Sequence, residues 1–324
     1  MTDSQIGIVV IGRNEGERLK VCLESVVKFG SVVYVDSGST DDSIAIATQL
    51  GVEVVNLDIS IPFTAARARN EGFQRLHELN ADLEYVQFVD GDCEVIEDWF
   101  NTATAFLDKN TKVAVVCGQR KERFPDASVY NRLCDIEWDT PIGEAKACGG
   151  DALMRSDVFE KVSGYNPDVI AGEESELCVR IRFQGRKIWR LDAEMTLHDA
   201  NMTRFGQWWK RNIRSGYAYA LGADMHGKSP EQHRLRETRR IWLWGAGIPV
   251  GILLAGIINP LSFICFLIYP LQIFRIAIKN RQLNANWSYA FFVTLGKFPE
   301  IQGQLKFLFD KTTKARSVII EYKD

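Results

Sequence analysis

The feature that most constrains this chain of 324 residues is a stretch of 34 residues, 241–274, without one charged side chain. No other segment of the sequence is apolar over a membrane-scale length. Asn259 and Pro260 divide it into two runs of about 18 residues, and at 1.5 Å per residue each run barely crosses a ~30 Å hydrocarbon core. Basic residues bound the stretch on both sides, namely Arg239, Arg240, Arg275, Lys279 and Arg281. Because the positive-inside rule puts both flanks on the cytoplasmic side, the sequence predicts a two-pass hairpin or a re-entrant wedge, with a buried core hairpin as the alternative.

Charge is divided between the two parts of the chain. Residues 1–203 carry 21 basic and 35 acidic side chains, whereas residues 204–324 carry 18 and 7. An acidic catalytic part and a basic part that faces anionic membrane lipids are therefore expected. The seven cysteines form no C-x-x-C pair and are odd in number, which indicates reduced thiols. Since the N-terminus shows no signal-peptide pattern, the expected location is the cytoplasmic face of the cell membrane.

Short apolar runs alternate with helical patterns over residues 1–200, which predicts an α/β fold with βαβ units and a mainly parallel sheet. Strands are expected at residues 6–11, 32–35, 52–55 and 85–89, and helices near residues 42–50 and 64–79 and before Gly30. The expected division is a catalytic domain at 1–222, a basic linker at 223–240, a hydrophobic helix pair at 241–278 and an amphipathic interfacial tail at 279–324. In that tail, Lys297, Lys306 and Lys311 are available for acidic lipid headgroups.

Ligands of open α/β sheets bind beyond the carboxyl ends of the strands, and the residues in those positions are unusually polar here. The fourth expected strand is followed by Asp90 and Asp92, two carboxylates separated by one small residue. Such a pair can hold a hard divalent cation, Mn²⁺ or Mg²⁺, and leave positions for phosphate oxygens. The cation would neutralise a diphosphate and assist its departure as a leaving group. The alternative is a solvated turn that caps the next helix.

Polar residues also follow the first two expected strands. Asn14 and Glu15 come after the first strand and are expected in the same binding site. Asp36 begins a Ser/Gly/Thr turn after the second strand, which suits hydrogen bonds to a nucleoside, whereas Asp41 is better placed to cap the next helix. Polar side chains between small alanines at the start of the following helix can face the base or the diphosphate, although a surface position is nearly as well supported. They are Arg67, Arg69 and Asn70.

Five motifs occur in an order and spacing that resemble those of glycosyltransferase family 2. They are V-V-I-G-R-N-E-G-E-R-L from Val9, V-D-S-G-S-T-D-D-S from Val35, A-R-N-E-G from Ala68, F-V-D-G-D from Phe88 and G-E-E-S-E-L from Gly172. The resemblance implies the GT-A fold, a Rossmann-like and mainly parallel sheet, and an inverting enzyme that uses a nucleotide-diphosphate sugar. It further implies that Asp36 contacts the nucleoside and that Asp90 and Asp92 contact the metal and the diphosphate.

The G-E-E-S-E-L motif implies that Glu174 is the general base, with Glu173 or Glu176 left possible because the family's second acid is commonly Asp. An inverting transfer needs such a carboxylate to take the proton of the acceptor hydroxyl. Three glutamates within four residues disfavour one another's ionisation, which raises one pKa toward the working range. The alternative is an acidic helix start that the helix macrodipole favours.

Further site residues follow from the same resemblance. His198 is similar to the histidine that some GT-A enzymes use as a metal ligand, or it is simply packed. Gly149, Gly150 and Asp151 resemble the glycine-rich acceptor strand of the family. Glu173 and Trp208 are the other expected acceptor contacts, and Trp208 serves equally well as a membrane anchor.

The sequence therefore predicts a metal-dependent glycosyltransferase that transfers a sugar to a lipid-linked or otherwise membrane-proximal acceptor for a cell-surface glycan. The alternative keeps the fold without catalysis, as a nucleotide-sugar-binding or scaffold subunit of a membrane assembly. The expected partners are the nucleotide sugar, the acceptor and membrane lipids, with no nucleic acid, and the oligomeric state is left open. A G-x-x-x-x-G-K-S match at residues 222–229 lacks the strand and the amphipathic helix that a phosphate loop requires.

Overall fold

The computed structural model describes residues 5–314, 320 and 321, and its internal contacts divide the chain into two units. The first unit comprises Met1–Pro125 and Cys134–Asn201, and the second comprises Asp126–Leu133 and Met202–Asp324. The predicted domain boundary at residue 222 falls inside a long helix that belongs to the second unit.

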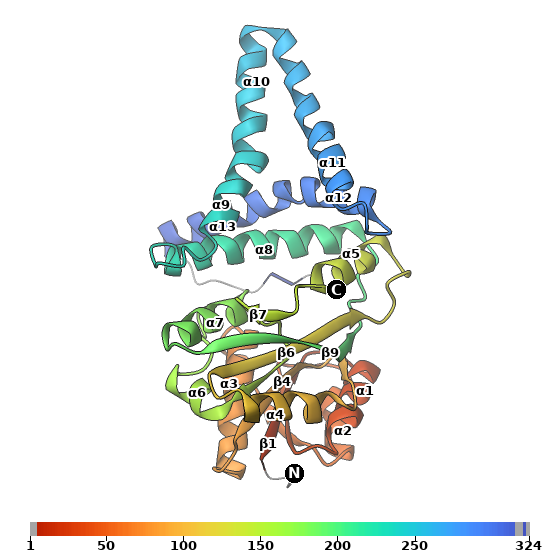
Figure 1. Cartoon of the computed structure of the whole chain (residues 1–324), viewed down its shortest axis with the longest axis vertical. Helices are drawn as coiled ribbons and strands as arrows, with labels where there is room; N and C mark the ends of the chain where they lie inside the picture. The colour runs from red at the N-terminus through yellow and green to blue at the C-terminus, as the bar shows by residue number, and fades with distance from the viewer. Residues whose placement is uncertain (1–4, 315–319, 322–324) are drawn as a thin grey trace. The chain divides into compact units, whose positions relative to one another are not determined.

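A nine-stranded sheet forms the centre of the first unit, in the order β3-β2-β1-β4-β8-β6-β9-β5 with β7 paired to β9 (Figure 1). The strands are β1 (Ile6–Gly12), β2 (Ser31–Asp36), β3 (Glu53–Asn56), β4 (Tyr85–Asp90), β5 (Cys93–Val95), β6 (Val113–Glu122), β7 (Gly143–Ala145), β8 (Ala152–Arg155) and β9 (Lys187–His198). The first four pair in parallel, as predicted. β5, β7 and β8 run antiparallel to their neighbours, so the sheet is mixed. These strands of three or four residues are too short for an alternating pattern to reveal them.

Helices cover the two faces of this sheet. They are α1 (Glu17–Val26), α2 (Ser43–Gln49), α3 (Ala65–Leu79), α4 (Trp99–Lys109), α6 (Ser156–Lys161) and α7 (Glu173–Phe183), while α5 (Val129–Trp138) is shared with the second unit. In α1 the apolar residues at helical spacing are buried, as the sequence predicted. α3 begins at Thr64, whose hydroxyl accepts a hydrogen bond from the Arg67 amide and so caps the first turn.

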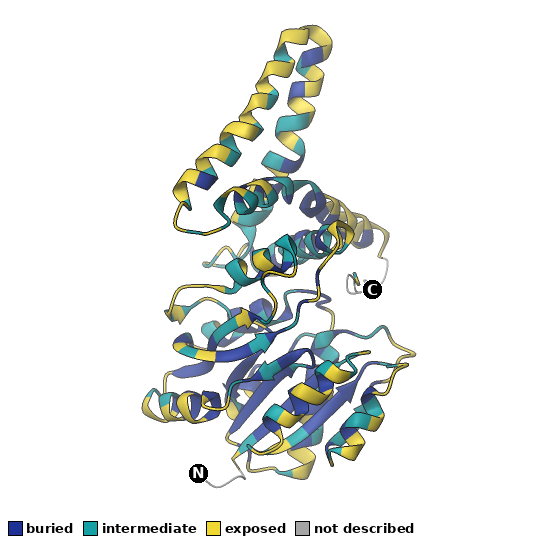
Figure 2. Ribbon diagram, turned by 90° about the vertical axis from the view of Figure 1, so that its right-hand side faces the viewer, coloured by how far each residue is buried: buried dark blue, intermediate teal, exposed yellow. Residues whose placement is uncertain are grey.

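The core of the first unit lies on both sides of its parallel strands. Five consecutive residues of β1 and five of β4 are buried, which explains why these strands are nearly continuous apolar runs rather than alternating ones. Figure 2 shows the strands of the sheet largely in dark blue, whereas the outer sides of the helices that cover it are mostly yellow and teal. In β1 and β4, whose one buried polar side chain is Gln87, the first charged residue therefore stands at or just after the end of the strand.

The second unit is helical. It contains α8 (Phe205–His226), α9 (Leu235–Trp242), the π-helical turn η1 (Leu243–Gly247), α10 (Ile248–Ile258), the 3₁₀ segment η2 (Pro260–Leu267), α11 (Ile268–Lys279), α12 (Asn286–Leu295) and α13 (Lys297–Thr313). α8 and α13 pack closely, because Gly216 and Gly303 leave no room for a side chain: a Cβ at either position would lie 1.9–2.0 Å from a backbone oxygen of the other helix. The G-x-x-x-x-G-K-S segment forms the end of α8 and a turn, with no preceding strand.

A hairpin of two long helices projects from the other helices of this unit (Figure 1). Its arms, Leu235–Ile258 and Pro260–Lys279, are long and apolar enough by length and composition to cross a membrane. Only 17% and 6% of their most apolar windows are buried. Large apolar side chains are exposed along both arms, including Val250, Leu254, Ile257, Ile258, Leu261, Ile264 and Leu271. These two helices are candidate membrane-associated segments, because an ordinary core hairpin would be buried.

Lysines of the predicted interfacial tail have carboxylate partners within the second unit. Lys297 pairs with Glu300, Lys306 lies 3.0 Å from Asp310, and Lys311 pairs with Asp224. By contrast, six exposed cations flank the base of the hairpin, and we call them the basic collar. They are Arg236, Arg239, Arg240, Arg275, Lys279 and Arg281.

Candidate active site

Asp36 and Asp90 lie at the carboxyl edge of the parallel strands. β1 lies between β2 and β4, with Gly12 paired to Asp36 and Ile11 paired to Asp90. The turns that follow these three strands therefore share one edge of the sheet, as the sequence analysis expected. At this edge the structure places two acidic networks, one around Asp36 and the other around Asp90.

Asp36 is buried, and its carboxylate stabilises the turn in which it lies. Its carboxylate accepts hydrogen bonds from the amides of Gly38 at 2.9 Å and Ser39 at 2.8 Å, and from the hydroxyl of Tyr34 at 2.8 Å. Burial and the neighbouring charge of Asp36 raise the pKa of Tyr34 far above its ordinary value, so that the phenol stays a donor. The Asp36 carboxylate thus fixes the shape of the loop that follows β2.

Asn14 joins the loops after β1 and β2. It adopts a left-handed backbone with φ of 57°, and its side-chain oxygen accepts a hydrogen bond of 2.7 Å from the Thr40 amide. Its own amide donates to the Ser39 hydroxyl at 2.9 Å. Glu15 forms an ion pair of 2.8 Å with Arg18. Both predicted residues therefore lie at the expected edge, where Asn14 ties the Asp36 turn to the first loop.

The three polar residues at the start of α3 have different surroundings. Arg67 donates to the backbone carbonyls of Asp58, Ile61 and Pro62 and so holds the preceding loop. Asn70 exchanges two hydrogen bonds with the backbone of Tyr165, at 2.7 and 2.9 Å. Only Arg69 points into the acidic network.

Arg69 links three carboxylates. Its guanidinium, 2% exposed, lies 2.7 Å from Asp90 Oδ1, 2.9 Å from Glu173 Oε1 and 3.5 Å from Glu174 Oε1. It also stacks at 5.3 Å from the centre of the Tyr165 ring. A buried guanidinium with this planar set of donors compensates carboxylates that would otherwise repel one another.

Arg120, at the end of β6, joins Asp90 from the other side. Its Nη2 lies 2.6 Å from Asp151 Oδ2 and 3.4 Å from Asp90 Oδ2. Asp151, at 0% exposure, also accepts hydrogen bonds from the Asp90 amide at 3.0 Å and the Thr196 hydroxyl at 2.9 Å. The structure thus places Asp151 beside Asp90, where it binds the Asp90 backbone and the Arg120 guanidinium.

Asp92 and His198 come together from different strands. His198 Nε2 lies 3.2 Å from Asp92 Oδ2, both residues are buried, and β5 pairs with β9 so that Cys93 is opposite His198. His198 Nδ1 faces Glu122 Oε2 at 3.9 Å and has no hydrogen-bond partner among the described residues. The Trp138 ring packs edge-to-face on the imidazole at 4.6 Å.

This pair fits a divalent cation. Adjacent ligands of an octahedral ion with bonds of about 2.1 Å are about 3 Å apart, which is close to the Asp92–His198 separation of 3.2 Å. A ligand atom of Cys93 lies within 4.8 Å of both. Asp90 belongs to a different group of close potential ligands, with Cys93 and Asp151, and two arginines face its oxygens. Of the three predicted metal ligands, the structure therefore brings Asp92 and His198 into direct contact.

The glycine pair before β8 allows these side chains to meet. A Cβ at Gly150 would lie 2.5 Å from Asp90 Oδ2 and 2.8 Å from Arg69 Nη2, so a side chain there would break the pair. Gly149 is exposed, and the nearest atoms to a Cβ there would be those of the Arg120 guanidinium, at 4.0 Å. Gly150 thus makes room for the network, while Gly149 leaves backbone open toward solvent.

The three glutamates at the start of α7 have different surroundings. Glu173 is buried against Arg69, and Glu176 is buried in an ion pair of 2.7 Å with Arg180. Glu174 is the most accessible, at 19% side-chain exposure. Burial and, to a smaller extent, the charge of Glu173 raise the pKa of Glu174 to about 7 against the opposing effect of Arg69. Among these three, Glu174 has the surroundings of a general base.

Trp208 belongs to the second unit. It lies in α8, is buried, and packs on Tyr130 at 6.5 Å and on Phe292 at 4.9 Å between ring centres. Its observed partners are therefore the aromatic core of that unit.

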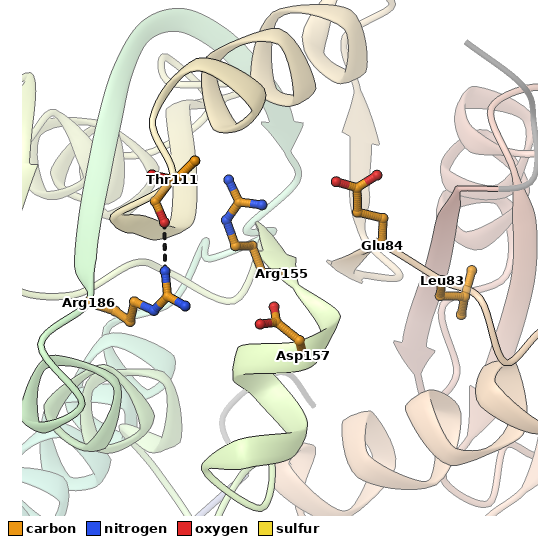
Figure 3. A pocket seen from close by; sticks show the side chains of 6 residues that line it. All are labelled: Leu83, Glu84, Thr111, Arg155, Asp157 and Arg186. Atoms are coloured by element: carbon orange, nitrogen blue, oxygen red, sulfur yellow. Dashed lines mark hydrogen bonds between the residues drawn. The ribbon is translucent and has the colours of Figure 1, made fainter.

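A cavity of about 340 Å³ lies at the opposite end of the strands (Figure 3). It is lined by Leu83, Glu84, Thr111, Arg155, Asp157 and Arg186, from segments that precede β4, β6 and β9 or follow β8. Arg155 donates to the carbonyls of Val113 and Leu107, and Arg186 donates to that of Thr111. Both cations therefore support loops, and the cavity is separate from the acidic edge that carries Asp90.

The mixed sheet and its covering helices have the fold of GT-A glycosyltransferases. Residues 7–162 match the sequence model of the family described as Glycosyl transferase family 2. A mannosyltransferase of Pyrobaculum calidifontis, solved with GDP-Man and Mn²⁺, is similar with a TM-score of 0.61 and 17% identity over 95% of this chain and 88% of that one. Residues 1–349 of TarS from S. aureus give a TM-score of 0.54 and 16% identity over 93% and 91%.

A curated relative shares only part of the sequence. A TPR repeat-containing protein of Synechococcus elongatus is 29% identical over 175 residues, which are 52% of this chain and 41% of that protein. The chain therefore spans less than half the length of this relative.

The sequence analysis did not identify Arg120, Glu122 or Trp138. Arg120 and Glu122 end β6, the longest strand between Asp90 and Glu174. The same rule that found Asp90, a polar residue after a buried apolar run, applies to the segment V-A-V-V-C-G-Q-R-K-E. Trp138 carried no comparable signal, because its position depends on where α5 packs.

Proposed function

We propose that this chain is a metal-dependent glycosyltransferase that transfers a sugar, with inversion, from a nucleotide-diphosphate donor to a lipid-linked or membrane-proximal acceptor. The observation that carries the proposal is the juxtaposition of Glu174, with a pKa of about 7, and Asp90 across Arg69. Displacement of a diphosphate requires a proton acceptor for the attacking hydroxyl and positive charge for the leaving group.

Glu174 is the proposed base. A single displacement that inverts the sugar carbon needs a carboxylate on the acceptor side to take the hydroxyl proton as the new bond forms. The place of Glu174 in the first turn of α7 and its contact with Arg69 fix the position of this carboxylate. Glu173, which Arg69 holds at 2.9 Å, raises the basicity of its neighbour without itself facing solvent.

The donor side is proposed to lie along Asp36, Asp90 and the two arginines. Asp36 shapes the loop for the nucleoside, and Arg69 and Arg120 place positive charge beside the position of the diphosphate. Asp92 and His198 would hold Mn²⁺ or Mg²⁺, which supplies charge neutralisation for the leaving group. Asp151 is assigned a positioning role, because it fixes the Asp90 backbone and Arg120 together.

The second unit is proposed to attach the enzyme to the cytoplasmic face of a membrane. The exposed apolar hairpin supplies the burial energy, since transfer of apolar surface out of water yields about 25 cal/mol per Å². The basic collar at its base matches the negative surface potential of a cytoplasmic leaflet, where each cation contributes about 1 kcal/mol. This attachment suits an acceptor that itself lies in the membrane.

The proposed activity is tested by release of nucleoside diphosphate from a panel of nucleotide sugars, with Mn²⁺ or Mg²⁺ and a membrane extract as the source of acceptor. Asp92→Asn is expected to lower turnover by at least about 100-fold, because a cation ligand is lost. Asp157→Asn, exposed at the opposite end of the strands, is the matched control and is expected to keep full turnover. Full activity in the presence of EDTA contradicts metal dependence, and no release with any donor contradicts the proposed function.

Membrane attachment is tested separately. The full chain is expected to remain in the membrane fraction after carbonate extraction, and single cysteines at positions 240 and 279 are expected to react from the cytoplasmic side. Labelling from opposite sides contradicts the hairpin. Recovery of the whole protein in the soluble fraction contradicts membrane attachment.

A further inference from the structure

Two thiols lie in contact beside the proposed base. Cys148 Sγ and Cys178 Sγ are 3.7 Å apart. Cys148 directly precedes Gly149 and Gly150, whereas Cys178 lies in α7, one helical turn after Glu174. The contact therefore connects the glycine segment at the site to the helix that carries the proposed base.

The two thiols differ in accessibility. Cys148 is partly exposed, and Cys178 is buried. A hydrogen bond from Cys148 lowers the pKa of Cys178, whereas the same bond and burial raise the pKa of Cys148. Cys22, Cys93 and Cys117 are buried and therefore lack the access to solvent that Cys148 has. Cys148 can thus meet a reagent from solvent, with Cys178 as the adjacent resolving thiol.

We propose that Cys148 and Cys178 are a modification site at which a low-molecular-weight disulfide forms a reversible intramolecular disulfide, and that this disulfide inhibits transfer. The chemistry is ordinary thiol–disulfide exchange. The Cys148 sulfur attacks one sulfur of the small disulfide, which releases one small thiol and leaves a mixed disulfide on Cys148. The Cys178 sulfur then attacks Cys148 Sγ and releases the second small thiol. The protein loses two electrons and two protons, and the small disulfide gains them.

Closure of this disulfide must move the site. A disulfide bond is about 2.05 Å long, so the two sulfurs must approach by more than 1 Å from their separation of 3.7 Å. That movement is shared between the glycine segment and α7. Gly150 lies within contact distance of Asp90 and Arg69, and Glu174 lies 3.5 Å from Arg69, so neither segment can shift without changing the network. A misplacement of about 1 Å at a reaction centre lowers rates by on the order of 100-fold.

The disulfide itself is tested without any activity measurement. The full chain carrying Cys265→Ser, which removes the exposed hairpin thiol, is treated with oxidised glutathione in detergent and digested without reduction. A linked peptide pair containing Cys148 and Cys178 is expected, and it is expected to disappear with dithiothreitol. Cys148→Ser is expected to abolish it, whereas Cys134→Ser, at another buried thiol, is expected to leave it unchanged. A parent protein whose Cys148 stays free, or stops at the mixed disulfide, overturns the proposal.

The second part of the proposal, that the disulfide inhibits transfer, rests on the proposed function and is tested on the same protein preparations. Oxidation is expected to lower transfer by on the order of 100-fold in the parent, with recovery on reduction, and to leave Cys148→Ser unaffected. Cys178→Ala is expected to stop at the mixed disulfide on Cys148 and to form no intramolecular link, with its thermal unfolding checked against the parent. A linked protein that keeps full activity overturns the inhibition. If the reduced protein transfers no sugar at all, the proposed function is contradicted. The linked peptide pair still tests whether Cys148 and Cys178 form a disulfide.

Discussion

Lowering the pH from 8 to 5 is expected to remove the activity of this enzyme by titrating Glu174. With a pKa of about 7, about 9% of Glu174 is ionised at pH 6 and about 1% at pH 5. A general base acts only when ionised, so kcat/KM is expected to fall about tenfold for each pH unit below this pKa. An unperturbed glutamate, with a pKa near 4.3, would leave activity almost unchanged down to about pH 5.5.

The neighbours of Glu174 supply the internal test of this assignment. The charge of Glu173 contributes to the raised pKa, so Glu173→Gln is expected to move the acid limb to lower pH. Arg69 opposes the shift, and its removal is expected to move the limb to higher pH. Glu174→Gln is expected to lose turnover at every pH while it retains donor affinity, because an amide hydrogen-bonds an acceptor but takes no proton.

The assay is nucleoside diphosphate release from pH 5 to 9 at low acceptor concentration, with Mn²⁺ saturating at each pH. A tenfold higher Mn²⁺ concentration must leave the acid limb in place, which separates ionisation of Glu174 from loss of metal at low pH. A profile that is flat to pH 5.5, or an acid limb that Glu173→Gln does not move, refutes the assignment of Glu174 as the titrating base.

The same raised pKa affects stability with a definite sign. The folded state holds the proton of Glu174 more tightly than the unfolded state, so stability is lost as the pH rises from about 4.5 to about 7. The shift corresponds to on the order of 3 kcal/mol above pH 7. Glu174→Gln is therefore expected to raise the thermal unfolding temperature at pH 8 but not at pH 4.5. An equal effect at both pH values means that the gain does not come from ionisation.

Two further predictions concern packing and charge in the two units. Arg69→Met is expected to destabilise the fold by about 3–5 kcal/mol, because it leaves buried carboxylates without their cation. Arg75→Met, on the exposed side of the same helix, is expected to have a much smaller effect, because its ion pairs are exposed to solvent. Thermal unfolding measures the loss of stability in each variant. Equal losses of stability in the two variants contradict the stabilising role of the buried Arg69 network. Gly303→Val is expected to separate α8 from α13 and to lower the unfolding temperature of the second unit, whereas Gly251→Val, with open space around its Cα, is expected to be neutral. Intrinsic fluorescence of the tryptophans in detergent follows this change.

The sequence was sufficient for those parts of the fold and site that local order determines. The buried runs of β1, β2 and β4 end at or beside the first charged residue, and parallel pairing brings these ends to one edge. Asp36, Asp90 and Asp92 were therefore placed correctly at that edge. The short antiparallel strands were not predicted, since β5 and β7 have only three residues each.

The orientation of individual side chains could not be predicted in this way. Arg67 and Arg69 are two residues apart on α3, and successive helix positions rotate by about 100°, so the two side chains face nearly opposite directions. The sequence shows that one arginine can face the site but not which one, because that depends on the rotation of the helix against the sheet. Contacts between distant segments, such as Arg120 with Asp90 or Cys148 with Cys178, have no local signal at all.

The charges of the acidic edge explain why a donor and a cation should bind together. The network contains the carboxylates of Asp90, Asp92, Glu122, Asp151, Glu173 and Glu174, and among the described residues the guanidiniums of Arg69 and Arg120 contact several of them. Even with Glu174 protonated, these groups carry an excess of negative charge, and a diphosphate alone would add to it. A divalent cation held by Asp92 and His198 would reduce that excess beside Asp90. Binding of the anionic donor and binding of the cation would therefore favour each other.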